Sequence, residues 1–90
     1  MNKHYSLLIS GTVQGVFFRA STKEKADTLG VKGFVRNEPD GRVYIEAEAE
    51  ERVLKDFAAW CARGPRQARV EKIEIKESTL KGFNDFVINR

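Results

Sequence analysis

The order of hydrophobic and polar positions along the chain predicts a small set of strands and helices. Residues 5–10 carry apolar side chains at both odd and even positions and are followed by Gly11, which is typical of a central strand. Residues 32–37 predict a second strand, and residues 43–49 alternate between apolar and polar side chains, as a half-buried third strand does. Turn-forming residues at 37–41 separate these two runs, so we expect the two strands to pair as a hairpin.

Two segments carry apolar residues at helical spacing. In the first, Ser21 and Glu24 have the S-x-x-E spacing of a capping box, which predicts a helix over about 21–29 that ends at Gly30. In the second, apolar side chains recur along one stripe until a Gly-Pro pair interrupts them, which predicts a helix over about 51–63.

The last quarter of the chain predicts two more strands. Residues 72–76 alternate in polarity, while Val70 is out of phase and is expected to precede a bulge. The apolar residues of 83–88 predict a short terminal strand. Right-handed crossovers in a βαββαβ order place both helices on one face of an antiparallel sheet. The expected fold is therefore an α+β, ferredoxin-like sandwich with a short extra C-terminal strand.

Composition narrows the kind of protein further. Ninety residues suit one domain, so residues 1–90 are expected to form a single unit. No apolar run approaches the ~20 residues of a membrane-spanning helix, and no signal-peptide core follows the first residues. The single cysteine, Cys61, cannot form an internal disulfide, so we expect a protein of the reducing cytoplasm. Cys61 also lies on the apolar stripe of the second predicted helix, so we expect it in the core. Since little apolar surface is left unexplained, a monomer is expected.

Charge is unevenly distributed along the chain, whose net charge is +3. Residues 1–37 carry six basic against two acidic side chains, residues 38–62 three against seven, and residues 63–90 seven against four. A basic first third favours a local anionic ligand over a nucleic acid bound across the whole surface. Solvated faces that merely alternate in sign explain the same distribution equally well.

The loop 11–19 is the best candidate for chemistry. It joins the end of a strand to the start of a helix, where free N–H groups and the helix dipole converge on an anion. Arg19 adds a cation that can bind phosphate through two parallel hydrogen bonds. The glycine spacing and the missing Lys-Ser/Thr exclude a Walker loop, and the missing third glycine excludes a dinucleotide fingerprint. From these residues alone, a tight turn beside a surface cation is the commoner explanation.

Two longer patterns resemble the signatures of the acylphosphatase family. Residues 11–19 read G-x-V-Q-G-V-x-F-R and resemble the first signature, and residues 33–43 read G-F-V-R-N-x-x-x-G-x-V and resemble the second. Residues 60–65 resemble the W-x-x-x-G-P stretch of the family, and the chain length matches as well. The resemblance therefore covers nearly the whole chain, although Ala49 stands where the second signature usually closes with a glycine.

This resemblance implies a hydrolase without a metal or other cofactor. Its substrates are small acyl phosphates, which it splits into a carboxylate and inorganic phosphate, and the phosphate is also expected to inhibit. The phosphate-binding arginine of the family corresponds to Arg19 and its water-positioning asparagine to Asn37. The backbone cradle of the family corresponds to the amides of Gln14, Gly15, Val16, Phe17 and Phe18.

The absence of catalytic acids from the two signatures agrees with this chemistry. A carboxylate leaving group has an unperturbed pKa of about 4, so it departs without a general acid. Neither signature supplies a basic side chain that could accept the proton of the attacking water. We therefore expect a phosphate oxygen of the substrate to take that proton.

Other polar residues are weaker candidates. His4 precedes the first predicted strand and is expected to be an exposed terminal residue, neither a base nor a ligand. The acidic residues Glu46, Glu48, Glu50 and Glu51 are expected to form a solvated face. A metal site would also require turn glycines and carbonyl ligands in fixed register.

Two other functions share the predicted fold. One is a single-stranded RNA-binding module, since residues 32–35 have a basic-Gly-aromatic pattern. In that module the pattern lies on the third strand, whereas here it lies on the second, and Glu46 and Glu48 on the third would repel phosphates. The other is a ligand-binding domain that does not turn over, against which the presence of both Arg19 and Asn37 argues.

Overall fold

Seven elements follow one another along residues 1–89, the part of the chain that the computed structural model describes. No helix in this part is long and apolar enough to cross a membrane. The predicted order is confirmed: β1 (Asn2–Thr12), α1 (Phe18–Leu29), β2 (Lys32–Asn37), β3 (Val43–Glu50), α2 (Glu51–Arg63), β4 (Arg69–Ser78) and β5 (Phe86–Ile88).

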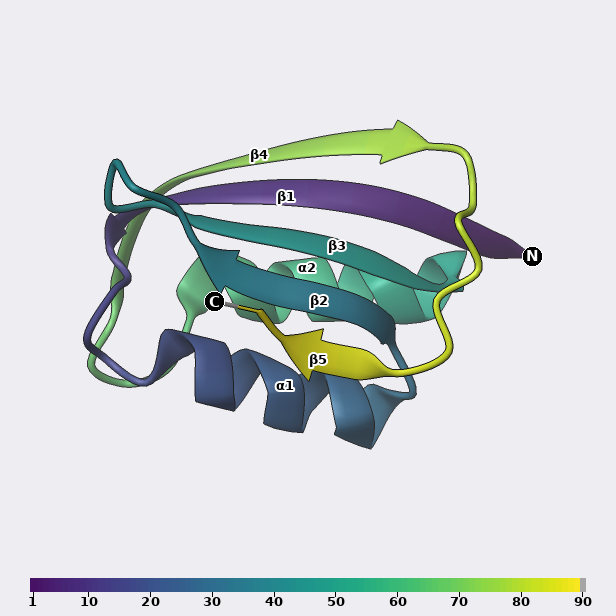
Figure 1. The fold of residues 1–90 in the computed structure, drawn as a ribbon, viewed down its shortest axis with the longest axis horizontal. Helices are drawn as coiled ribbons and strands as arrows, with labels where there is room; N and C mark the ends of the chain where they lie inside the picture. Colours follow the sequence, from purple (N-terminus) through teal and green to yellow (C-terminus); the bar gives the residue numbers. More distant parts are fainter. Residues whose placement is uncertain (90) are drawn as a thin grey trace.

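The strands form one sheet in the order β4-β1-β3-β2-β5, with the two helices packed beside each other against it (Figure 1). The first four strands pair antiparallel, and β5 joins the edge parallel to β2. This is the expected ferredoxin-like sandwich with an added strand. The core between sheet and helices contains Leu7, Ile9, Val35, Val43, Ile45, Phe18, Leu54, Phe57 and Cys61.

Sheet topology brings two chain segments to the same end of the molecule. Because β1 and β2 both pair antiparallel with β3, they run in the same direction, and their C-terminal ends lie at the same end of the sheet. At this end, on the left of Figure 1, β1 passes into the loop that leads to α1, and β2 passes into the turn that leads to β3.

The start of α1 corrects the sequence prediction. The helix begins at Phe18, three residues before the predicted start, and Ser21 lies inside its first turn with its N–H donating to Phe17 O at 3.0 Å. The predicted capping box is therefore wrong. The start is set by packing, since Phe18 is buried with its ring 6.0 Å from that of Trp60. The end at Gly30, which has a positive φ of 77°, is as predicted.

Helix α2 and strand β4 agree with the sequence analysis. The helix spans residues 51–63, as its apolar stripe predicted. The predicted bulge before the regular part of β4 is also confirmed, because Ser10 pairs with Lys72 and Gly11 with Val70, which leaves Glu71 as the extra residue. A side chain at Gly11 would place its Cβ 2.1 Å from the carbonyl oxygen opposite, so only glycine fits there.

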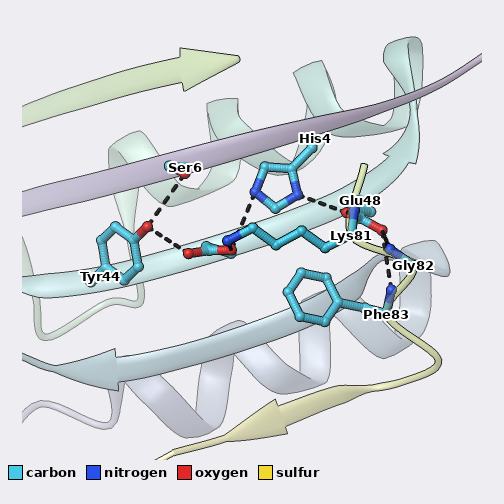
Figure 2. Close-up of polar contacts among 8 residues, drawn as sticks. His4, Ser6, Tyr44, Glu48, Lys81, Gly82 and Phe83 are labelled. Carbon is cyan, nitrogen blue, oxygen red and sulfur yellow. Dashed lines mark hydrogen bonds and ion pairs between the residues drawn. The ribbon is translucent and has the colours of Figure 1, made fainter. Parts of the chain in front are cut away.

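His4 is fully buried, so its expected position as an exposed terminal residue is wrong. Strand β1 begins at Asn2 and carries His4 onto the sheet face opposite the helices. There the His4 Nδ1–H donates to Glu48 Oε2 at 2.7 Å, and Nε2 lies 3.3 Å from Glu46 Oε1 (Figure 2). The imidazole also stacks against Phe83, with ring centroids 5.9 Å apart.

Glu46 and Glu48 are buried as well, which corrects the prediction that they belong to a solvated face. The connection between β4 and β5 contacts both carboxylates, and Figure 2 shows its Lys81, Gly82 and Phe83 beside Glu48. The backbone N–H groups of Lys81, Gly82 and Phe83 all donate to the Glu48 carboxylate, and Lys81 Nζ lies 2.8 Å from Glu46 Oε1. The two carboxylates therefore fasten the segment that leads into β5.

Replacing Glu48 by glutamine is expected to lower the free energy of unfolding by about 3 kcal/mol, because the buried His4 and three backbone N–H groups lose their charged acceptor. Burial opposes the charge of Glu48, but hydrogen bonds from Lys81, His4 and Phe83 outweigh burial and hold the pKa of this carboxyl below its usual value. The stabilisation is therefore fully present above a pH of about 4.5 and is lost as the pH falls through the lowered pKa of the folded state.

Urea unfolding at neutral and at acidic pH measures this effect. The control is Glu50→Gln, which removes an exposed carboxylate from the end of the same strand. A loss of similar size in both variants, or a loss for Glu48→Gln that persists unchanged in acid, would contradict the assigned role of Glu48.

Candidate active site

An open pocket of about 690 Å³ lies at the end of the sheet where β1 and β2 terminate. It brings together residues from the loop after β1, the first turn of α1, the end of β2 and the end of β5. The lining residues are Val13, Gly15, Phe17, Phe18, Arg19, Ala20, Asn37 and Ile88. Arg19 and Asn37, which stand far apart in the sequence, therefore share one cavity.

The loop backbone is shaped to present N–H groups. Gly15 and Phe17 are both left-handed, with φ of 75° and 62°, and right-handed helix follows directly from Phe18. Alternation between the two hands turns successive N–H groups toward one side, which makes a concave anion site. Phe17, the N-cap residue, makes no side-chain cap, and the first helical hydrogen bond is the one that the Ser21 N–H donates to Phe17 O. The N–H groups of the three residues before Ser21 precede that bond and have no acceptor within the helix.

The electrostatics of this helix start are unusual. The positive end of a helix dipole favours acidic side chains, yet the first turn of α1 has none and carries Arg19 instead. Within the described chain, no carboxylate lies at ion-pairing distance from the Arg19 guanidinium. The positive field of the pocket is therefore not balanced by these residues, and a bound anion would balance it.

Two side-chain amides near the pocket are used differently. Gln14 Nε2 donates to Glu38 O at 2.8 Å and to Arg42 O at 3.0 Å, so it ties the loop to the turn between β2 and β3. Asn37, the last residue of β2, has a buried Oδ1 with no hydrogen-bond partner among residues 1–89. Within the described residues, the Oδ1 of Asn37 is thus not used to hold the fold together.

The predicted site residues are only partly brought together. Arg19, Asn37 and three of the five cradle residues, namely Gly15, Phe17 and Phe18, line the pocket. Gln14 and Val16 do not line it, since Gln14 braces the loop through its side chain and Val16 packs partly buried against the core.

Sequence reasoning missed two features of this site. Ile88 reaches the pocket because β5 pairs with β2, where Val35 lies opposite Ile88 and accepts a bond from the Asn89 N–H at 2.8 Å. Nothing in the terminal residues indicates which strand they join. The bracing role of Gln14 depends on two carbonyls more than twenty residues away, so it also left no local signal.

Apart from Arg19, no titratable side chain is found among the described residues that line the pocket. Cys61 lies in the core, where burial raises the pKa of its thiol far above the usual value. Ala49 is buried in β3 opposite Lys3, at the end of the strand away from Asn37. The substitution of the usual glycine therefore does not touch the pocket.

The fold and the pocket define a small α+β domain with an anion site at a helix start, and comparisons with known proteins identify its family. The acylphosphatase family model matches residues 5–88. The acylphosphatase of Methylococcus capsulatus is 44% identical over 98% of this chain and 97% of its own. That of Rubrobacter xylanophilus is 49% identical over 89% of this chain and 73% of its own.

Solved structures agree with this result. The crystal structure of the acylphosphatase from Bacillus subtilis superposes with a TM-score of 0.95 at 36% identity, and the match covers all of both chains. The chain belongs to the acylphosphatase family. It is a hydrolase that acts on acyl phosphates, with a carboxylate and phosphate as products. These comparisons favour the hydrolase over the RNA-binding and the non-catalytic alternatives.

Proposed function

We propose that this chain hydrolyses acyl phosphates in the pocket between the 13–18 loop and the end of β2, without a metal ion. Arg19 and the amides of the loop hold the phosphoryl group, and Asn37 positions the attacking water. The observation that carries this proposal is that one pocket contains an uncapped helix start, an arginine without an ion pair among residues 1–89, and an amide oxygen without a partner.

The loop and Arg19 suit the charge of a phosphoryl group. Backbone N–H groups and a planar guanidinium donate several hydrogen bonds to phosphate oxygens, and the guanidinium can do so with two parallel bonds. These donors are fixed before the substrate arrives, because Gln14 braces the loop and Phe18 anchors the helix in the core. Fixed donors stabilise the charge that spreads over the phosphoryl oxygens during transfer.

The side chain of Asn37 can position the attacking water. Its Oδ1 can accept a hydrogen bond from a water molecule, which orients the water oxygen toward the phosphorus. The water oxygen forms the new P–O bond, the bond between phosphorus and the acyl oxygen breaks, and its electron pair leaves with the carboxylate. The proton of the water moves to a phosphoryl oxygen, since none of the described lining residues carries a base.

Protein dialysed exhaustively against EDTA is expected to release phosphate from benzoyl phosphate at the full rate, because the cations of this site are Arg19 and backbone amides. It is expected to leave phenyl phosphate nearly untouched, since phenolate is a much poorer leaving group than benzoate. Inorganic phosphate is expected to inhibit competitively. Loss of turnover in EDTA with recovery in Mg²⁺ would contradict the metal-free mechanism, and equal rates on the two substrates would contradict the acyl phosphate specificity.

We further propose that residues 1–90 work as a single domain, as a monomer in the cytoplasm, with no nucleic acid partner. One buried thiol and the absence of a second cysteine suit a reducing compartment. The 81–83 segment lies over Glu46 and Glu48 on the sheet face opposite the helices, so this part of the face is not open to stacked bases.

A further inference from the structure

The pocket extends beyond the phosphate donors into an apolar rim. Phe17 lies on the loop with 73% of its surface exposed, and Ile88 lies on β5 with 39% exposed. These are two of the few large apolar side chains that the described chain leaves in water, and both line the same pocket. A volume of about 690 Å³ is also far more than a phosphoryl group requires and falls within the range of small-molecule sites.

The backbone conformation and the exposure of Phe17 are both unfavourable for the free energy of folding. A bulky residue with φ of 62° is an outlier, because the left-handed region crowds the side chain against its own backbone. Its ring is also left in water, whereas the neighbouring Phe18 is buried. Residue 17 occupies one of the two unspecified positions of the G-x-V-Q-G-V-x-F-R pattern, so the turn itself does not demand an aromatic side chain. Residues 1–89 therefore leave most of this ring uncovered, and a bound molecule could cover it.

The charge of the lining limits what that molecule can be. Among the described residues that line the pocket, Arg19 is the only charged one, and the proposed function commits it to the phosphoryl group. None of these described lining residues offers a second cation for a carboxylate or phosphate on the acyl half. An apolar acyl group in this position would instead cover Phe17 and Ile88 and remove their surface from water.

We infer that Phe17 and Ile88 bind the acyl half of the substrate and that the enzyme prefers neutral acyl groups of about the size of an aromatic ring. The inference rests on the proposed function, since it assumes that the phosphoryl group occupies the adjacent cradle. It adds the substrate class and two specificity-determining residues to that function.

The test compares kcat/KM for benzoyl phosphate, acetyl phosphate and succinyl phosphate, each divided by the rate of its uncatalysed hydrolysis. The wild-type protein is expected to favour benzoyl over both others. The main variant is Phe17→Asn, because asparagine accepts left-handed backbone and so keeps the loop while it removes the ring. The second is Ile88→Thr, which keeps a β-branched side chain on β5.

Phe17→Asn is expected to lower the benzoyl-to-acetyl ratio roughly five- to tenfold, and Ile88→Thr about threefold, as loss of part of a side-chain contact predicts. The matched control is Val87→Thr. Val87 is 38% exposed but lies on the other face of the same strand, opposite Phe34, so this variant is expected to leave the ratio unchanged. The inhibition constant of inorganic phosphate, which has no acyl half, serves as the reference for the cradle.

The outcomes separate the two proposals. If Phe17→Asn lowers kcat/KM for all three substrates equally, or if wild type shows no preference for benzoyl, the acyl rim is wrong while the hydrolase mechanism stands. A preference for succinyl phosphate would also overturn the rim, because it would require a cation at the acyl end. If the wild-type protein hydrolyses none of the three, the proposed function itself fails.

Discussion

Arg19→Ala is expected to lower kcat/KM for benzoyl phosphate by at least about a thousandfold, the range found when a single positioned charge is removed from a phosphoryl-transfer site. Arg19 is the only charged residue among the described residues that line the pocket, so none of these residues can replace its charge. The affinity for inorganic phosphate is expected to fall in parallel, because the guanidinium binds the phosphoryl group in the ground state and in the transition state alike.

A conservative variant and the free energy of unfolding provide the controls. Arg19→Lys is expected to recover little activity, since an ammonium group cannot make two parallel hydrogen bonds to a phosphoryl group. The free energy of unfolding is expected to stay within about 0.5 kcal/mol, because within residues 1–89 Arg19 makes no ion pair and stands at the unfavourable end of a helix dipole. If Arg19→Ala retained a third of the wild-type kcat/KM, the role of Arg19 would be wrong.

The sequence was most informative where burial follows a local period. Helix α2 begins and ends as predicted because its apolar stripe is strong and a Gly-Pro pair follows it. The hairpin of β2 and β3 was equally readable from alternation and turn residues. The start of α1 was not, because Ser21 and Glu24 satisfy a capping pattern while the burial of Phe18 decides where the helix begins.

The errors on His4, Glu46 and Glu48 have a different cause. Alternation predicts which face of a strand a residue occupies, and it placed Glu46 and Glu48 on the outer face of their strand, whereas His4 was expected to precede the first strand. Alternation does not predict what covers that face. Here the segment before β5 folds back and donates three N–H groups to Glu48, a long-range contact that no local pattern encodes.

The residues of the site also divide into those that the sequence predicted and those that only long-range contacts bring to the pocket. Arg19 and Asn37 were predicted through the family resemblance, and the pocket unites them because β1 and β2 terminate at one end of the sheet. The apolar rim could not be predicted, because Ile88 reaches the pocket only through the parallel pairing of β5 with β2. The left-handed backbone of Phe17 was equally hidden, since nothing in an aromatic residue indicates that conformation.

Asn37→Ala is expected to lower kcat by about two to three orders of magnitude while it leaves the affinity for inorganic phosphate nearly intact. Asn37 is proposed to hold the water and not the phosphoryl group, so its loss affects attack and spares binding. Arg19→Ala and Asn37→Ala therefore separate the two functions of the pocket. Single-turnover measurements of phosphate release give the effect on kcat, and isothermal calorimetry with phosphate gives the effect on binding.

Stability supplies a readout that distinguishes this role from a structural one. Because Asn37 Oδ1 is buried without a partner among the described residues, its removal breaks no hydrogen bond made by that oxygen within them, and Asn37→Ala is expected to leave the free energy of unfolding unchanged or slightly raised. A structural asparagine would instead lose stability and activity together. A parallel loss of phosphate affinity in Asn37→Ala would show that Asn37 binds the phosphoryl group, and the assignment of the water to this residue would then have to be abandoned.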